Sequence, residues 1–173
     1  MCMTIRNYKE ISPSIHDGVY IDDTALVIGN VNIGAHSSVW PMCVVRGDVN
    51  WISIGSYTNI QDGTIIHVNH VSEYEPEGST VVIGNYVTVG HRCTLHGCHI
   101  NDRCLIGMNS CLMDNVVVES NVMVAAGSLV PSGKRLESGF LYLGSPAKKI
   151  RALTAKEIEH ITYSAEHYAK LSI

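Results

Sequence analysis

The sequence predicts an all-β protein built as a parallel β-helix of hexapeptide repeats, with one α-helix at its C-terminal end. Three observations lead to this fold. Aliphatic residues recur every six positions, glycine often follows the aliphatic residue, and the position four after it is usually small or β-branched. Repeats this short are typical of a β-helix, in which one strand and one corner recur and stacked coils bury a continuous core. Fifteen glycines and a single Phe also argue against a sandwich or a doubly wound sheet.

The aliphatic repeat defines the coils in order along the chain. Its members are Ile15, Ile21, Val27, Ile33, Val39, Val45, Ile54, Ile60, Ile66, Ile83, Val89, Leu95, Ile100, Ile106, Leu112, Val118, Val124 and Val130. Three hexads make one triangular coil, so these eighteen hexads predict about six coils. Cys43, Cys93 and Cys104 occupy small positions and are expected to pack in the interior. Cys98 and Cys111 fall in other phases and are candidates for exposure.

The segment after the repeat predicts a helix. Thr154 and Glu157 are spaced as the two members of a capping box. Apolar residues then follow at three and four spacing, which indicates an amphipathic helix over residues 155–170, lying along the outside of the coils. The predicted organisation is a β-helix over residues 1–152 and a helix over residues 153–173, within one domain.

Composition narrows the classes of function. The net charge is −4 and Lys and Arg are not clustered, so neither nucleic acid nor an anionic membrane is an expected partner. No apolar run approaches the length needed to cross a bilayer. The N-terminus lacks the apolar stretch of a signal peptide, which predicts a cytoplasmic protein. Six cysteines in that location are expected to be free thiols.

The register of the repeat brings two histidines together. With Ile54, Ile60 and Ile66 taken to mark the first, second and third faces of a coil, His67 directly follows a third-face residue. One coil later, His96 occupies the same place. Adjacent strands lie about 4.8 Å apart, so these two imidazoles can share one metal ion.

A third histidine lies too far away to join them within one chain. His91 comes two residues after the second-face Val89, on the corner between the second and third faces. Five residues separate it from His96 and span up to about 16 Å, somewhat less around a corner. If all three histidines bind one ion, His91 must come from another subunit. A three-fold axis parallel to the stack would then give a homotrimer with three equivalent metal sites.

Further polar residues extend these two columns. Arg46 lies one coil before His67, and Asp62 lies one coil before His91, with Gln61 beside it. A column of Arg, His and His next to a column of Asp and His has the character of a site. The alternative is that the histidines are solvated surface residues that stack by coincidence.

The segments RGDVNWISIGSYTNIQDGTIIH (residues 46–67) and VTVGHRCTLHGC (residues 87–98) resemble the gamma-class carbonic anhydrases. The resemblance implies the left-handed form of the β-helix, whereas the general rule for parallel crossovers favours the right hand. It implies that zinc, or alternatively iron or cobalt, is held across a homotrimer interface by His67, His91 and His96.

The same resemblance assigns further roles. It implies an interfacial ion pair between Arg46 and Asp48, a Gln61 that orients the reactive hydroxide, and an Asp62 in the same polar cluster. A tyrosine of the C-terminal helix approaches the site in small bacterial members, and Tyr163 is the expected counterpart.

The implied activity is the reversible hydration of carbon dioxide to bicarbonate by a metal-bound hydroxide. Three neutral His ligands leave a fourth position open for water, as in catalytic zinc sites. The sequence departs from the archetype of this family at Val49 and at His70, where the archetype has glutamates. His70 is the candidate proton shuttle, because an imidazole exchanges protons readily near neutral pH.

Two other classes of function remain open at this point. The first is an acyltransferase or thioesterase of the hexapeptide superfamily, although an acyltransferase with one catalytic histidine does not explain three in metal register. The second is a non-catalytic trimeric scaffold or binding protein, in which the metal only staples the interface.

Overall fold

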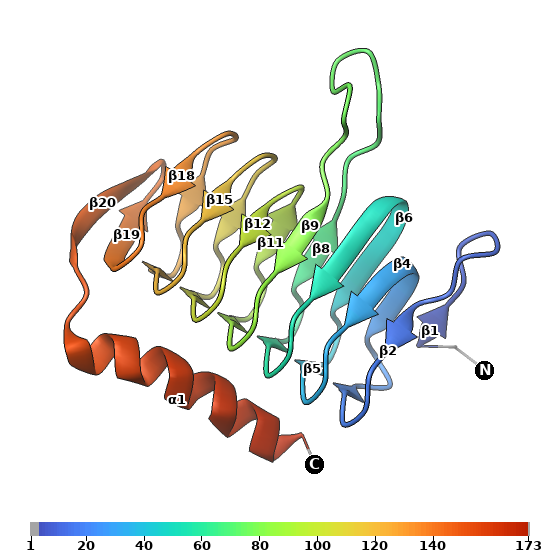
Figure 1. Cartoon of the computed structure of the whole chain (residues 1–173), viewed down its shortest axis with the longest axis horizontal. Helices are drawn as coiled ribbons and strands as arrows, with labels where there is room; N and C mark the ends of the chain where they lie inside the picture. The colour runs from blue at the N-terminus through green and yellow to red at the C-terminus, as the bar shows by residue number, and fades with distance from the viewer. Residues whose placement is uncertain (1–3, 173) are drawn as a thin grey trace.

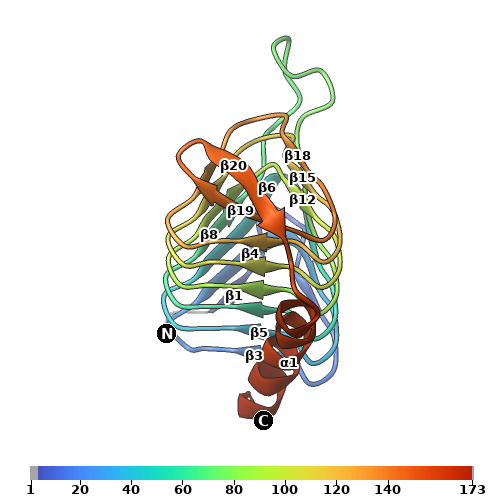
Figure 2. The same cartoon turned by 90° about the vertical axis from the view of Figure 1, so that its left-hand side faces the viewer.

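The computed structural model describes residues 4–172 and is a parallel β-helix with one α-helix along its side (Figure 1). Seen nearly along the stack, the coils superpose as a triangle, and the helix lies outside one of its three sides (Figure 2). Residues 1–3 and 173 are outside the described part of the chain, and Cys2, one of the predicted free thiols, is among them.

Each face of the triangle is a parallel sheet. The first face contains β2 (Ser14–Ile15), the end of β4 (Leu26–Ile33), the end of β6 (Val44–Ile54), β9 (Val81–Ile83), β12 (His99–Ile100), β15 (Val117–Val118) and β18 (Arg135–Leu136). The second face contains β3 (Tyr20–Ile21), β5 (Ser38–Val39), β7 (Asn59–Ile60), β10 (Thr88–Val89), β13 (Leu105–Ile106), β16 (Met123–Val124) and β19 (Phe140–Gly144). The third face contains β1 (Ile5–Arg6), the starts of β4 and β6, β8 (Ile65–His67), β11 (Thr94–His96), β14 (Cys111–Leu112) and β17 (Leu129–Val130).

The stack continues beyond the six coils predicted, at both ends. At the N-terminal end, β1 pairs in parallel with the start of β4. At the other end, β18 pairs with β15 and β19 pairs with β16. Strand β20 (Ala147–Ala152) then turns back antiparallel to β19 and closes this edge of the sheet. The repeat predicted too few coils because two of its members were not counted. Leu136 and Tyr142 follow Val130 at the same six-residue spacing and are buried.

The core is the inward column of aliphatic residues that the hexad phase predicted. Ile60 pairs with Val89, and Leu95 pairs with Ile66 and Leu112, so equivalent positions of successive coils lie in register. These side chains are fully buried. Burying them removes apolar surface from water at every level of the stack, which stabilises coils that no single turn could hold alone.

The exposure suggested for Cys98 is wrong. Its side chain is fully buried, and burial raises the pKa of the thiol to about 12. The reason is that the hexad from Leu95 to Ile100 is one residue short. In a regular hexad the small interior position lies two residues before the next inward aliphatic residue. Cys98 lies two residues before Ile100 and therefore occupies this position. Cys111 is half-buried.

Two insertions interrupt the regular coils. β6 extends over 11 residues and bends from the third face to the first. Residues 68–80 form a long hairpin that stands away from the stack between β8 and β9 (Figure 1). An antiparallel bridge between Asn69 and Ser79 closes the base of this hairpin.

Helix α1 (Ala155–Leu171) begins at the predicted capping box. The Thr154 side chain accepts a hydrogen bond from the backbone N–H of Glu157, whose carboxylate accepts one from the backbone N–H of Thr154. Ile161 and Ala165 are buried against the second face, where the helix contacts β7 and β10. Among residues 4–172, no helix has the length and apolar character needed to cross a membrane.

Candidate metal centre

The column of Arg46, His67 and His96 runs across three adjacent strands of the third face. Arg46 of β6 pairs with His67 of β8, which pairs with His96 of β11. The inward neighbours of these residues are buried, so the polar side chains project outward from the same level of successive coils. The Nδ1 atom of His67 lies 3.2 Å from the Nε2 atom of His96.

A carboxylate holds the other nitrogen of each ring. The Nε2 of His67 lies 2.9 Å from Asp48 Oδ1, and the Nδ1 of His96 lies 2.7 Å from Asp114 Oδ1. An ionised carboxylate only accepts hydrogen bonds, so each of these ring nitrogens must carry the proton. In the neutral rings, the two nitrogens that face each other are then both lone-pair donors.

Two lone pairs converging at 3.2 Å repel one another unless an added proton or a metal ion lies between them. With Zn–N bonds of 2.0–2.1 Å, two ligands of a tetrahedral zinc ion are about 3.4 Å apart. The spacing of His67 and His96 therefore matches one edge of such a site. Imidazoles oriented by carboxylates are also the usual form of histidine ligands. These residues fit a metal ion.

Asp48 links this pair to Arg46. Burial favours the neutral acid, but hydrogen bonds from His67 and Arg46 and the charge of Arg46 outweigh it and lower the pKa of Asp48. The Arg46 guanidinium is in contact with the Asp48 carboxylate. The carboxylate is thus kept ionised and fixed beside His67.

His91 lies apart from this pair, on the corner between the second and third faces. Its Nδ1 atom is 2.9 Å from Asp62 Oδ2, and the side chains of His91 and Asp62 are 44% and 49% exposed. Its Nε2 atom is left facing away from this carboxylate. Within residues 4–172, no three His, Cys, Asp or Glu side chains converge as a complete metal site. A single chain therefore supplies a pair of oriented imidazoles and a separate third one.

Gln61 is buried beside this corner and belongs to a polar network. Its Nε2 atom donates to Asn59 Oδ1 at 3.1 Å, and the Asn59 amide donates to Thr88 Oγ1 at 2.9 Å. The Thr88 hydroxyl is 3.2 Å from that of Ser164 in α1. Because its amide nitrogen is committed to Asn59, the Gln61 side chain has a fixed orientation.

Comparison with known proteins places the chain among carbonic anhydrase relatives. Residues 97–132 match the family model for the bacterial transferase hexapeptide (six repeats). Protein YrdA of Escherichia coli is 51% identical over 98% of this chain and 92% of its own length. A probable carbonic anhydrase of Methanocaldococcus jannaschii is 39% identical over 91% of this chain and 95% of its own length. Gamma carbonic anhydrase 2 of Arabidopsis thaliana mitochondria is 46% identical over 98% of this chain and 60% of its own length.

The chain belongs to the gamma carbonic anhydrase-like hexapeptide-repeat family. A solved structure of a hexapeptide transferase family protein from Anaplasma phagocytophilum has the same fold. It superposes with a TM-score of 0.91 at 41% identity, over 99% of this chain and 98% of that one.

Tyr163 and His70, two residues expected in a gamma carbonic anhydrase site, make their contacts elsewhere in the single chain. Tyr163 is 60% exposed and stacks between His160 and His167 on α1. His70 is exposed at the base of the hairpin, where its backbone N–H donates to Asn69 Oδ1.

Another tyrosine of α1 lies closer to the Asp62 corner. The pKa of Tyr168 is raised by burial and by the charge of Asp62. Its ring meets Trp40 edge-on, with centroids 5.6 Å apart. The C-terminal half of α1 is therefore docked beside this corner of the β-helix.

Asp114, which contacts His96, was not predicted from the sequence. A signal was present: Asp114 lies two residues after the third-face Leu112, just as Asp62 lies two after the second-face Ile60. The shortened hexad after Leu95 obscured its relation to His96.

Proposed function

We propose that this protein is a metal-dependent carbonic anhydrase, which reversibly hydrates carbon dioxide to bicarbonate at a site shared between subunits of a homotrimer. The observation that carries the proposal is the pair of carboxylate-held imidazoles, whose free nitrogens approach to 3.2 Å. Membership of the gamma carbonic anhydrase-like family supports the same activity.

The third ligand in this proposal is His91 of a neighbouring subunit. His91 has its own carboxylate partner, Asp62, and is exposed on a corner, so it is available to a second chain. Exposed apolar side chains occur on the same part of the surface: Met108, at the position of His91 in the next coil, is 51% exposed, and Met42 and Ile65, in earlier coils, are 68% and 48% exposed. Exposed apolar residues that gather around polar ligands are a common mark of a subunit interface.

A three-fold arrangement would complete the site. A heterologous contact that closes into a ring brings each His67–His96 pair to the His91 of the next chain. Arg46 and Asp48, which lie beside His67, would then lie at the same interface. Three such contacts give three equivalent sites.

A zinc ion bound by three neutral imidazoles supplies Lewis acidity, which makes water a nucleophile near neutral pH. Iron(II) and cobalt(II) suit the same ligands. Asp48 and Asp114 keep the ligand rings in one tautomer, so the site is organised before the metal arrives. The Gln61 amide donates one N–H to Asn59. Its carbonyl oxygen and its second N–H would be presented to the reacting water and to carbon dioxide. Asp62 fixes His91.

Hydration adds one water to carbon dioxide and releases bicarbonate and one proton. The proton must reach bulk solvent, and His70 is our candidate for its carrier. Its side chain is exposed on the hairpin that follows His67, and an imidazole exchanges protons readily near neutral pH. Tyr163 is proposed to approach the neighbouring subunit's site from α1.

The free thiols of the described cysteines support a cytoplasmic location for the protein. Cys43, Cys93, Cys98, Cys104 and Cys111 are all free, as expected in a reducing compartment. The acyltransferase and scaffold alternatives make different predictions: an acyltransferase needs no metal, and a scaffold binds metal without turnover.

The test is stopped-flow hydration of carbon dioxide by protein purified without oxygen, with metal content measured on the same sample. We expect metal-dependent hydration that is lost in His96→Ala together with the metal. Full metal occupancy without hydration would contradict the proposed activity and favour a scaffold.

A further inference from the structure

Asp114 lies at the corner after β14, one coil beyond His96, and is not part of the two segments that resemble the family. We propose that Asp114 is a positioning residue that fixes the tautomer and orientation of His96, and through it the affinity of the site for its metal. This inference rests on the proposed function, because it assigns Asp114 a role toward the same metal ion.

The hydrogen bond is short and directed. Asp114 Oδ1 lies 2.7 Å from the Nδ1 of His96, which is shorter than either of the other His–Asp contacts, each 2.9 Å. Charge-assisted N–H···O bonds of this length are among the stronger ones. With its proton held on Nδ1, His96 directs its Nε2 lone pair at His67. The tautomer of an imidazole is set by the hydrogen bond that its second nitrogen makes.

A glycine makes room for this carboxylate. Gly97 directly follows His96 and has a φ of +54°, and a Cβ atom there would overlap Asp114 Oδ1. The positive φ alone does not require glycine, since Arg92 and Arg103 have φ values of +55° and +53°, but a side chain at Gly97 would displace the carboxylate. The shortened hexad between Leu95 and Ile100 creates this corner. The short hexad therefore allows Asp114 to reach His96.

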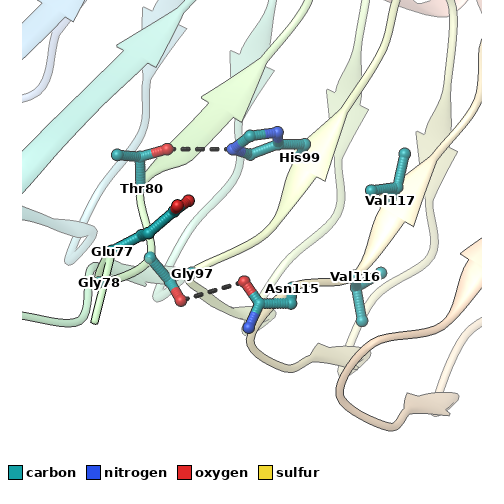
Figure 3. A pocket seen from close by; sticks show the side chains of 9 residues that line it. Glu77, Gly78, Thr80, Gly97, His99, Asn115, Val116 and Val117 are labelled. Carbon is teal, nitrogen blue, oxygen red and sulfur yellow. Dashed lines mark hydrogen bonds between the residues drawn. The ribbon is translucent and has the colours of Figure 1, made fainter. Parts of the chain in front are cut away.

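The backbone that carries Asp114 is braced from the other side. Asn115 donates its backbone N–H to the Gly97 carbonyl at 2.8 Å. Its side chain accepts from Ser79 Oγ at 3.2 Å, at the base of the hairpin (Figure 3), and donates to Glu75 Oε1 at 3.1 Å. These contacts tie the corner to the hairpin at residues 68–80.

A cavity of about 340 Å³ lies beside this corner, lined by Gly97, His99 and Asn115 among others (Figure 3). Asp114 does not line the cavity. Its carboxylate is directed at His96 instead. Asp114 is therefore held by a specific contact with His96 and is not merely a solvated surface carboxylate.

The test compares Asp114→Asn and Asp114→Ala with the matched control Asp102→Asn in the full-length protein. Asp102 also braces a corner, but its carboxylate is bonded to an asparagine rather than to a histidine: Oδ1 accepts from the backbone N–H of Asn85 at 2.7 Å and from the Asn85 amide at 3.2 Å. The probe is Co²⁺, titrated against a competing chelator and followed by its visible absorption. The second readout is the long-range ¹⁵N–¹H spectrum of the histidine rings in metal-free protein, with His96→Gln used to assign His96.

We expect about 10- to 100-fold weaker Co²⁺ binding in both Asp114 variants, with the larger loss in Asp114→Ala, in keeping with other residues that orient metal ligands. The cobalt absorption should shift, and His96 should lose its Nδ1–H signature. The control should bind Co²⁺ within about twofold of the wild type, because it removes a carboxylate without touching a ligand.

The outcomes separate the two proposals. Wild-type affinity and an unchanged His96 tautomer in both Asp114 variants would overturn the positioning role and leave the carbonic anhydrase proposal standing. Tight Co²⁺ binding that depends on Asp114, in a protein without hydration activity, would support the positioning role and refute the activity. A wild-type protein that binds no Co²⁺ or Zn²⁺ would overturn both.

Discussion

The coils before and after residue 98 use the same repeat in different ways. After it, from β12 to β18, strands of two residues recur at a constant spacing. The residues with positive φ recur every sixth position as Arg103, Asn109, Asn115, Asn121, Gly127, Gly133 and Gly139. Before it, β6 is 11 residues long, a hairpin is inserted at residues 68–80 and one hexad is short.

The candidate ligands His67, His91 and His96 all lie in the irregular half. Apart from Arg103, the regular half has Asn or Gly at its positive-φ corners, and these residues tolerate that conformation well. We infer that the buried aliphatic column stabilises every coil, whereas the candidate metal site is formed where the chain departs from the regular repeat. Each prediction below tests that division, beginning with the largest expected effect.

The first prediction separates stability from metal binding. Ile106→Ala should lower the free energy of unfolding by about 3 kcal/mol, because it leaves a cavity in the fully buried column. It should retain its metal. His96→Ala should lose the metal and, compared with metal-free wild type, shift the urea midpoint far less. Urea titration and metal analysis of both variants measure these effects. Loss of metal from Ile106→Ala under conditions where it is folded would contradict the separation of stability from metal binding.

The second prediction concerns Gln61. Gln61→Ala should leave metal content unchanged and slow hydration of carbon dioxide by about 10- to 100-fold, since it removes an oriented amide from the reacting groups. Stopped-flow kinetics with parallel metal analysis measure it. Asn59→Ala serves as the companion variant, and it should show a smaller loss because Gln61 then loses its orientation but not its amide. Equal hydration rates in Gln61→Ala and wild type would remove Gln61 from the reaction.

The third prediction concerns the hairpin. His70→Ala should lower kcat by about 3- to 10-fold at low buffer concentration, with kcat/KM nearly unchanged, because only the exit of the proton is impaired. Added imidazole should restore the rate. His99→Ala is the control, since His99 bonds to Thr80 and lines the cavity at the hairpin base. A rate that does not respond to buffer in either protein would exclude His70 as the carrier.

The smallest effect is expected at the start of α1. Thr154→Ala should cost about 1 kcal/mol, the usual effect of losing an N-cap. Glu157, its partner, has a pKa lowered from 4.5 to about 2 by its hydrogen bonds with Arg151 and Thr154. Because the folded-state pKa is the lower one, its contribution is present above pH 4.5 and is lost as the pH falls toward 2. Helicity followed by circular dichroism should therefore be lower in Glu157→Gln than in wild type at pH 5, and the difference should shrink as the pH falls toward 2.

Much of the fold was predictable because a repeat of fixed phase determines which residues stack. The alignment of Arg46, His67 and His96 follows directly from counting hexads, and the structure has this register. The capping box at Thr154 was equally local. What could not be predicted depended on changes of phase. The short hexad after Leu95 hid both the burial of Cys98 and the contact between Asp114 and His96.

The contacts of Tyr163 with His160 and His167 could not be read from the sequence either. A helical pattern shows which residues share a face, but it does not show how a neighbouring subunit meets that face. The same holds for His91, whose proposed role requires a second chain.

The central claim is that each metal site is built from two subunits, and mixed trimers test it most directly. His91→Ala and His96→Ala chains, each expected to be metal-free alone, are unfolded together in equal amounts, refolded and loaded with zinc. In a three-fold ring, every mixed trimer has one interface where an intact His67–His96 pair meets an intact His91. Random assembly should therefore restore about a quarter of the wild-type metal content. A mixture that binds no more metal than the two variants alone, although mixed trimers have formed, would contradict the intersubunit site.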